Sequence, residues 1–97
     1  MLIHQEKYNI TPSSGTIGQN ISAGGKMLKH VFIKATTSST TFDAKLTDIY
    51  SNIVFVRDDN TGELNELLEL PSIGNWTLTI TNASVDEVFN VLFLFSE

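Results

Sequence analysis

The sequence predicts an all-β protein, a small antiparallel β-sandwich of about seven or eight short strands. Short runs of β-branched and aromatic residues alternate with turn residues at intervals of about 8–12 residues. Within several runs apolar and polar residues alternate, which is typical of a strand with one buried face. The chain has 97 residues and no cysteine, so we expect one domain, residues 1–97, that is held together without disulfides.

The first half of the chain contains four expected strands. We expect a strand over residues 2–10 and a weaker one over 16–22, and we expect residues 11–26 to form a flexible loop or arm. The alternation is clearer over residues 29–37 and over 42–46, where every second residue is apolar. On the first of these two strands one face takes Val31, Ile33 and Ala35, and the other takes His30, Phe32 and Lys34.

The middle of the chain predicts a hairpin. Residues 52–57 are apolar on both faces, and the turn-forming run 58–62 ends in a glycine suited to a left-handed conformation. We therefore expect the chain to reverse there and to return through residues 63–70. After a turn at 71–74, residues 75–82 give the clearest strand, with Trp76, Leu78 and Ile80 on one face.

Two segments are open to a second interpretation. Leu64, Leu67 and Leu68 fit one helical turn before Pro71. Residues 84–95 begin with a Ser and a Glu spaced as in a capping box and continue with apolar residues at helical spacing. Such a helix would be apolar nearly all round, and the β-branched and aromatic content favours a strand over 88–95. We favour the strand.

The last strand is apolar on both faces. Its core face takes Phe89, Val91, Phe93 and Phe95, and its other face takes Val88, Leu92 and Leu94. The outward face of a two-layer sandwich normally meets water, so something is expected to cover these three residues. Two explanations stay open: cover by the chain's own N-terminal segment, or a subunit or partner interface, including pairing of strand edges between subunits.

The residues needed for catalysis are not recognisable in the sequence. A hydroxyl nucleophile needs a histidine base, and His4 and His30 come without a nucleophile motif. We expect these histidines to lie on the surface or in an interface. The expectation is a protein that is not an enzyme and needs no cofactor.

One acidic stretch has the composition of a calcium loop. Asp58, Asp59, Asn60 and Glu63 place oxygen ligands close together in the chain. The glycine of an EF-hand loop stands at position 6, whereas Gly62 stands at position 5 counted from Asp58. Hairpin loops use the same residues, so we favour a turn and predict no metal site.

Charge and hydropathy exclude several partners. The net charge is −5 and the six basic residues are scattered, so no basic patch for nucleic acid is present. The longest apolar run, residues 91–95, is far shorter than the about 20 residues of a membrane helix. The first residues are too polar for a secretory signal. We expect neither nucleic-acid nor membrane binding, in a protein made in the cytoplasm of a cell.

A local motif resembles a known domain type. Gly74, Trp76 and Leu78 form a Gly-x-Trp-x-Leu pattern within residues 74–80, which is similar to a strand of the P-domain-type jelly rolls appended to secreted proteases. The likeness covers one strand and its turn. It implies a jelly-roll-like arrangement of the sandwich.

In size, composition and strand pattern the chain resembles small virion proteins of tailed bacteriophages. Head decoration (cement) proteins of these phages are often cysteine-free β-sandwiches rich in Thr, Ser and Asn. The resemblance implies a virion protein, made in the host cytoplasm, that binds the major capsid protein or another virion protein as a homo-oligomer, with a trimer favoured. It also implies that residues 11–26 become ordered on assembly.

Two alternative functions follow from the same observations. A neck, tail or fibre accessory protein of a phage fits nearly as well as a decoration protein. A carbohydrate- or surface-binding module would need an exposed aromatic platform, for which Tyr8, Tyr50 and Trp76 are the candidates. Because Trp76 alternates in phase with Leu78 and Ile80, we expect it in the core instead.

Overall fold

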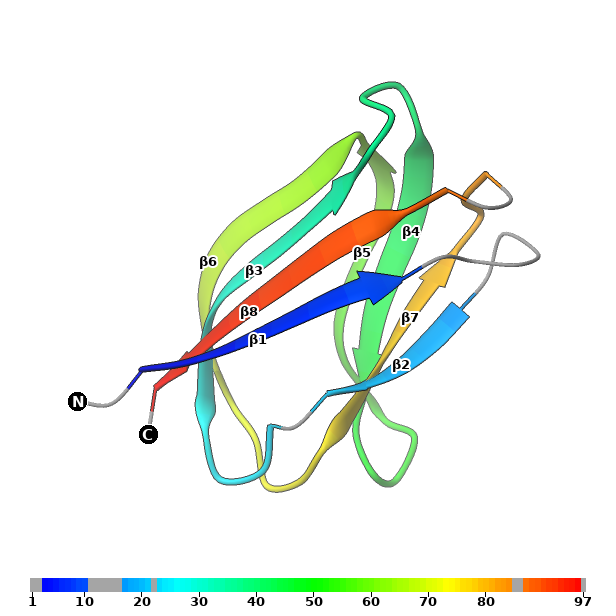
Figure 1. Ribbon diagram of the computed structural model, residues 1–97. Coiled ribbons are helices and arrows are strands. Elements are labelled where there is room, and N and C mark those ends of the chain that lie inside the picture. Colours follow the sequence, from blue (N-terminus) through cyan, green and yellow to red (C-terminus); the bar gives the residue numbers. More distant parts are fainter. Residues whose placement is uncertain (1–2, 11–16, 22, 85–86, 97) are drawn as a thin grey trace.

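The computed structural model describes residues 3–10, 17–21, 23–84 and 87–96, which form eight strands and no helix (Figure 1). Within these residues, therefore, no helix has the length and apolarity required to cross a membrane. The strands are β1 (Ile3–Ile10), β2 (Ile17–Ile21), β3 (Met27–Ala35), β4 (Thr41–Thr47), β5 (Ile53–Thr61), β6 (Glu63–Pro71), β7 (Trp76–Thr81) and β8 (Phe89–Ser96).

The strands form two four-stranded sheets that lie face to face (Figure 1). Sheet A has the order β1-β8-β3-β6 and sheet B the order β2-β7-β4-β5, and all neighbours are antiparallel. Only β4 and β5 are both consecutive in the chain and neighbours in a sheet. Eight strands in this order make a jelly roll. The predicted all-β sandwich is confirmed.

The predicted hairpin at residues 58–62 is wrong. Strand β5 continues through these residues to Thr61 and pairs with β4, whereas β6 pairs with β3 in the opposite sheet. Gly62 turns the chain from sheet B to sheet A with φ of 76°. The sequence marks the change of direction correctly, because this backbone conformation favours glycine. Turn composition alone does not say whether the returning strand joins the same sheet or the facing one.

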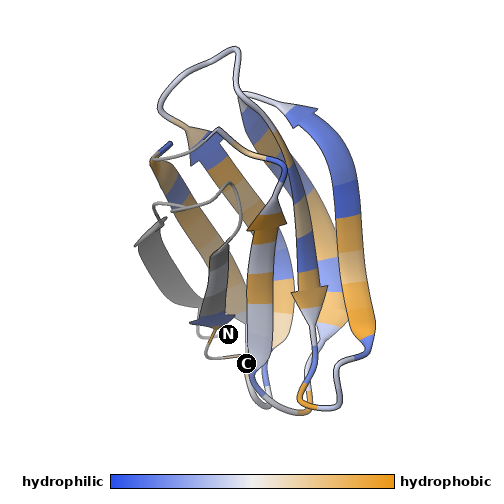
Figure 2. Cartoon of the chain, turned by 90° about the vertical axis from the view of Figure 1, so that its right-hand side faces the viewer, coloured by the Kyte–Doolittle hydropathy of each residue, from blue (hydrophilic) through white to orange (hydrophobic). Residues whose placement is uncertain are grey.

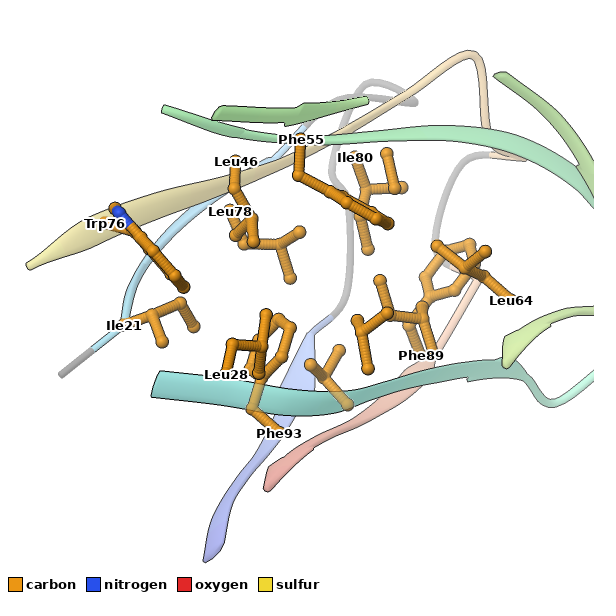
Figure 3. Close-up of a cluster of buried hydrophobic side chains, with 14 of the residues drawn as sticks. Ile21, Leu28, Leu46, Phe55, Leu64, Trp76, Leu78, Ile80, Phe89 and Phe93 are labelled. Atoms are coloured by element: carbon orange, nitrogen blue, oxygen red, sulfur yellow. The ribbon is translucent and has the colours of Figure 1, made fainter. Parts of the chain in front are cut away.

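The core lies between the sheets, where alternate residues of the strands meet (Figure 3). Figure 2 shows the alternation as bands of opposite hydropathy along the strands. Trp76, Leu78 and Ile80 are buried as predicted. The ring of Trp76 packs against that of Phe95, with 6.2 Å between the ring centroids. The rings of Phe42 in sheet B and Phe89 in sheet A pack edge to face, with 5.0 Å between their centroids.

Residues 89–96 form a strand, as favoured over a helix. β8 lies between β1 and β3, so its backbone has a hydrogen-bonding neighbour on each side. Its inward residues Phe89, Val91, Phe93 and Phe95 have no exposed surface. Residues 63–71 are also a strand, and no helical turn precedes Pro71. Pairing and burial outweigh the helical spacing of the leucines in both segments.

One irregularity in sheet A was not predicted. The register of β3 shifts between Leu28 and His30, against both β6 and β8. As a result Leu28 and Val31 both point into the core although they are three residues apart. The strand therefore begins at Met27, before the alternation that the sequence displays.

The segment 11–26, predicted to be a flexible arm, contains described structure. Residues 17–21 form β2, which pairs with β7 at the edge of sheet B. The turn after it is fixed by two backbone hydrogen bonds, from Lys26 N–H to the Ala23 carbonyl at 3.1 Å and from Gly25 N–H to the Ser72 carbonyl at 3.0 Å. Residues 11–16 and 22 lie outside the described residues, so the flexibility of the arm stays a prediction.

An ion pair joins β5 and β6 at the edge of the sandwich where these two strands face each other. Arg57 donates from Nε and Nη2 to the two carboxylate oxygens of Glu66, at 2.9 and 2.6 Å. The guanidinium also lies over the ring of Phe55, 4.5 Å from its centroid. Both side chains are partly exposed, so the pair contributes at most about 1 kcal/mol.

Candidate functional site

The side of sheet A that faces away from the core carries the predicted residues of β8. Leu92 and Leu94 lie there, half-buried, on the opposite side of the strand from the four buried residues. Val88 precedes the strand, and its carbonyl accepts the Thr36 N–H at 3.0 Å. Leu92 and Leu94 are thus together on the face, and Val88 lies at its end.

Neighbouring strands add further apolar side chains to this side. In the strand register Leu92 stands opposite Phe32, and Leu94 opposite His30 on β3. His30 in turn stands opposite Leu67 on β6, which is 79% exposed. Directly paired residues point to the same side of a sheet. We call these five residues the outer face: His30, Phe32, Leu67, Leu92 and Leu94.

Polar groups fix and border the outer face. His30 Nε2 is 2.5 Å from Asn65 Oδ1, and the imidazole meets the edge of the Phe32 ring at 6.5 Å between centroids. The ammonium of Lys29 donates to Glu69 at 2.8 Å, which lowers the pKa of that carboxyl. An apolar centre with a charged border is the usual anatomy of a protein interface.

The N-terminal strand does not lie across these residues. β1 pairs with β8 along its whole length, with Lys7 opposite Leu92 and Gln5 opposite Leu94. Residues 3–10 therefore lie beside β8 in the same sheet, and they flank Leu92 and Leu94 instead of covering them. Of the two explanations for the second apolar side of β8, this arrangement excludes only cover by the backbone of residues 3–10.

Two residues of the outer face were missed from the sequence, although the signal was present. Phe32 alternates out of phase with the buried residues Val31 and Ile33, which places it on the outward side of the strand. Leu67 is adjacent to Leu68 in a strand, so one of the two must point outward. Neither signal identifies a site until the register places Phe32 opposite Leu92 and Leu67 opposite His30.

A second group of exposed apolar residues lies at one end of the sandwich. We call this the loop end: the connections 23–26, 48–52 and 72–75, which meet at the same end of the sheets (Figure 1). A carbohydrate-binding platform needs an exposed aromatic side chain. Of the candidates named from the sequence, Tyr50 is 71% exposed, whereas Trp76 is buried. The side chain of the third candidate, Tyr8, lies outside the described part. The other exposed apolar residues of this end are Ile49, Ile53 and Ile73.

The acidic stretch 58–63 does not form a loop. Asp58, Asp59 and Asn60 are consecutive residues of β5, and Glu63 begins β6. The Asp59 N–H donates to the carboxylate of Asp43 at 2.8 Å, and this bond lowers the pKa of Asp43. In the described residues no three His, Asp or Glu side chains gather in a way that could hold a metal ion.

The two histidines lie on different strands of sheet A. His4 is on β1, opposite Phe95 in the register, and His30 is on β3, opposite Leu94. The side chain of His4 lies outside the described part. His30 contacts an amide and an aromatic ring, and no hydroxyl group of a described side chain bonds to its Nε2.

Comparison with known proteins gives neighbours in fold and none in sequence. No family model matches the chain, and no curated protein matches it. Among solved structures it is similar to the Yersinia pseudotuberculosis-derived mitogen, at 14% identity and a TM-score of 0.53, over 99% of this chain and 86% of the mitogen. The likeness concerns the fold alone.

A viral protein is a more distant neighbour. The VP2 subviral particle protein of infectious bursal disease virus aligns with 98% of this chain and 40% of its own, at 12% identity and a TM-score of 0.35. A score this low supports no statement about function.

Proposed function

We propose that this protein is a non-enzymatic assembly protein that binds other protein subunits through its outer face. The observation that supports this best is the group of apolar side chains on the solvent side of sheet A, where Leu92 stands opposite Phe32. In the next row Leu94 and Leu67 stand on either side of His30. An apolar surface at the centre of a sheet, bordered by charged residues, is typical of a subunit contact. A sheet side meant only for water would be polar at these positions.

In its specific form the proposal is a structural protein of a tailed-phage virion, a head decoration protein that stabilises the shell by bridging subunits of the major capsid protein. A protein that binds only the assembled shell stabilises the shell by mass action. Small size, absence of cysteine and a jelly-roll sandwich agree with the resemblance described above. In this proposal the protein is a homo-oligomer, with a trimer favoured, and a neck or tail position is the alternative.

The proposal is tested by mixing the purified protein with shells assembled from the phage's major capsid protein and pelleting the shells. The parent protein should sediment with the shells and should elute as an oligomer, with its mass measured by light scattering. A monomer that stays in the supernatant would contradict both parts of the proposal.

Three variants locate the contact. Leu92→Asp places a charge at the centre of the outer face, and Leu67→Asp does so at a position that is 79% exposed and therefore tolerates a polar residue. Each should weaken shell binding at least about tenfold, because a desolvated charge disfavours an apolar contact. Ile73→Asp is the matched control: Ile73 lies at the loop end, its side chain is 85% exposed, and the variant should bind the shells as the parent does. If Leu67→Asp folds and binds unchanged, the outer face is not the contact.

A further inference from the structure

A pocket of about 410 Å³ lies at the loop end, on a different surface from the outer face. It is formed by the end of β2, the connection 48–52 and the first residues of β7, which are far apart in the sequence. Its volume is in the range of small-molecule sites, about 300–1,000 Å³. Of the eight described residues that line it, six carry hydroxyl, amide or carboxylate groups and none is basic.

Asp48 is held in place at the wall of this pocket. Its Oδ1 accepts the N–H groups of Tyr50 and Asn52 at 2.9 and 2.8 Å, and its Oδ2 accepts the side-chain amide of Asn52 at 3.3 Å. These bonds lower the pKa of Asp48, with burial opposing the shift. A carboxylate has roughly four acceptor positions. The bonds from described residues occupy three of them, which leaves one, on Oδ2, for a hydroxyl donor of a ligand.

Asn75 supplies a donor of fixed orientation. Its Oδ1 accepts the N–H groups of Ala23 and Gly24 at 3.3 and 3.4 Å. Because the oxygen faces the 23–26 turn, the amide nitrogen is the part of the side chain available to a ligand, and within the described part of the chain no hydrogen bond engages it. The pocket thus presents an amide donor and a carboxylate acceptor, both positioned before any ligand arrives.

Hydroxyl groups complete the lining. The Thr77 hydroxyl also lines the pocket and lies 3.5 Å from the amide oxygen of Asn20. Ser51 lines it from a backbone with φ of 66°, a left-handed conformation that is rare for a residue with a side chain. Hydroxyls both donate and accept, so these groups match a ligand that itself carries several hydroxyls.

The charge of the pocket narrows the class of ligand. Among the described lining residues there is one carboxylate and no basic side chain, so an anion such as a phosphate or a uronic acid would be repelled. A neutral hydroxylated molecule satisfies the donors and the acceptor without an unpaired charge. Tyr50, between two lining residues and 71% exposed, offers an aromatic surface to the C–H groups of such a molecule.

We propose that the pocket between Asp48, Ser51, Asn75 and Thr77 is a binding site for one neutral sugar unit, with Tyr50 at its rim. The site is independent of the outer face. It gives the protein a second function, recognition of a hydroxylated ligand at the end of the sandwich that carries the 48–52 connection. Preformed polar groups lower the entropy that binding costs.

The test uses amide-resolved NMR titration of the intact protein with the methyl glycosides of glucose, galactose, mannose and N-acetylglucosamine, and with glucuronate as the charged comparison. At least one neutral glycoside should shift the amide signals of Tyr50, Ser51 and Asn75, with a Kd on the order of 1–10 mM. Glucuronate should bind at least about tenfold more weakly. If no neutral sugar shifts these signals, or if glucuronate binds equally well, the proposal fails.

Variants separate this site from the assembly surface. Tyr50→Ala should weaken sugar binding about three- to tenfold, and Ser51→Gly should weaken it while the fold is kept, because glycine suits the left-handed backbone. Leu67→Ala is the matched control and should leave the titration unchanged. If the protein binds sugar but not shells, only the assembly proposal is overturned. If it binds shells but not sugar, only the sugar site is overturned.

A comparison of an oligosaccharide with its terminal methyl glycoside distinguishes a site for glycan chains from a site for free sugars. An oligosaccharide that binds tighter than its terminal methyl glycoside supports the site as a reader of glycan chains. Equal binding supports a site for free sugars.

Discussion

At the scale of single residues, two glycines have the same backbone conformation and different surroundings. Gly62 has φ of 76° and Gly25 has φ of 73°. A Cβ added at Gly62 would lie 2.5 Å from the carbonyl oxygen of Ser38, whereas one added at Gly25 would meet nothing within 4 Å. The carbonyl belongs to the backbone of the 36–40 connection, which Gly62 binds through a 2.7 Å bond to the Thr40 carbonyl. Position 62 therefore requires glycine both for its left-handed backbone and for lack of space for a Cβ atom, whereas position 25 requires it for the backbone conformation alone.

The pair makes a matched stability test. Gly25→Ala should lower the free energy of unfolding by about 1–2 kcal/mol, the cost of a left-handed backbone for a residue with a Cβ. Gly62→Ala should lower it by a further about 1–3 kcal/mol, because a backbone segment must shift to admit the methyl group. Urea denaturation of both variants measures the difference. Equal losses would mean that the 36–40 connection adjusts without cost.

At the scale of elements, carboxylates join strand ends that belong to different parts of the chain. Asp43 on β4 accepts the Asp59 N–H of β5 and the side-chain amide of Asn82, which follows β7. Glu87, just before β8, accepts the Thr37 N–H at 2.7 Å and the Thr36 hydroxyl at 2.8 Å, after β3. These bonds lower the pKa of both carboxyls below the usual range.

The direction of these shifts predicts the acid stability. The unfolded chain takes up protons near the ordinary values of about 3.9 for Asp and 4.3 for Glu, and the folded chain does so at lower pH. The stabilisation is therefore complete above about pH 5 and is lost as the pH falls through the folded pKa values. The urea midpoint should decline steadily below about pH 5. Glu87→Gln should have a lower midpoint at pH 7 and should approach the parent in acid.

A constant difference between Glu87→Gln and the parent from pH 7 to pH 3 would contradict this role of Glu87. Asp58→Asn is the control, because Asp58 lies on the exposed part of β5 and its side chain makes none of these bonds. Its midpoint should follow the parent at every pH.

At the scale of the whole molecule, the jelly roll joins the two ends of the chain. Ile3 pairs with Ser96, and β1 remains paired with β8 up to Ile10 and Phe89. The two middle strands of sheet A, β8 and β3, are also distant in the sequence. Among the eight described strands, only β4 and β5 are consecutive in the chain and paired with each other. The fold therefore depends on contacts that close long loops of chain before they gain stability.

This topology predicts slow folding. Domains dominated by distant strand pairs fold in milliseconds to seconds, whereas proteins rich in local contacts fold in microseconds to milliseconds. The single tryptophan, Trp76, is 3% exposed and packs on Phe95 of β8, so its fluorescence reports the approach of the two sheets. Stopped-flow dilution from urea should give a relaxation in that slower range. Full recovery of the Trp76 signal within the dead time would contradict the prediction.

The sequence by itself determined the approximate number of strands and the inward residues of the clearest ones, although it assigned residues 58–61 of β5 to a turn. Alternation is a local property, so Trp76, Leu78 and Ile80 could be assigned to the core from the sequence, and the outward direction of Leu92 and Leu94 follows from the same period of two. The left-handed glycine at 62 was also predictable, because turn chemistry is local. The shift at Leu28 was not, since a bulge depends on the strands alongside.

Only the tertiary structure decided which strands are neighbours and which surfaces and pockets these neighbours form. It sent β6 to the opposite sheet from β5, because a strand's partner is set by packing of the whole core and not by its turn. It placed Phe32 opposite Leu92 and Leu67 opposite His30, and it assembled Asp48, Ser51 and Asn75 around one pocket. Sites of this kind combine residues from distant strands, so they exist only once the register of both sheets is fixed.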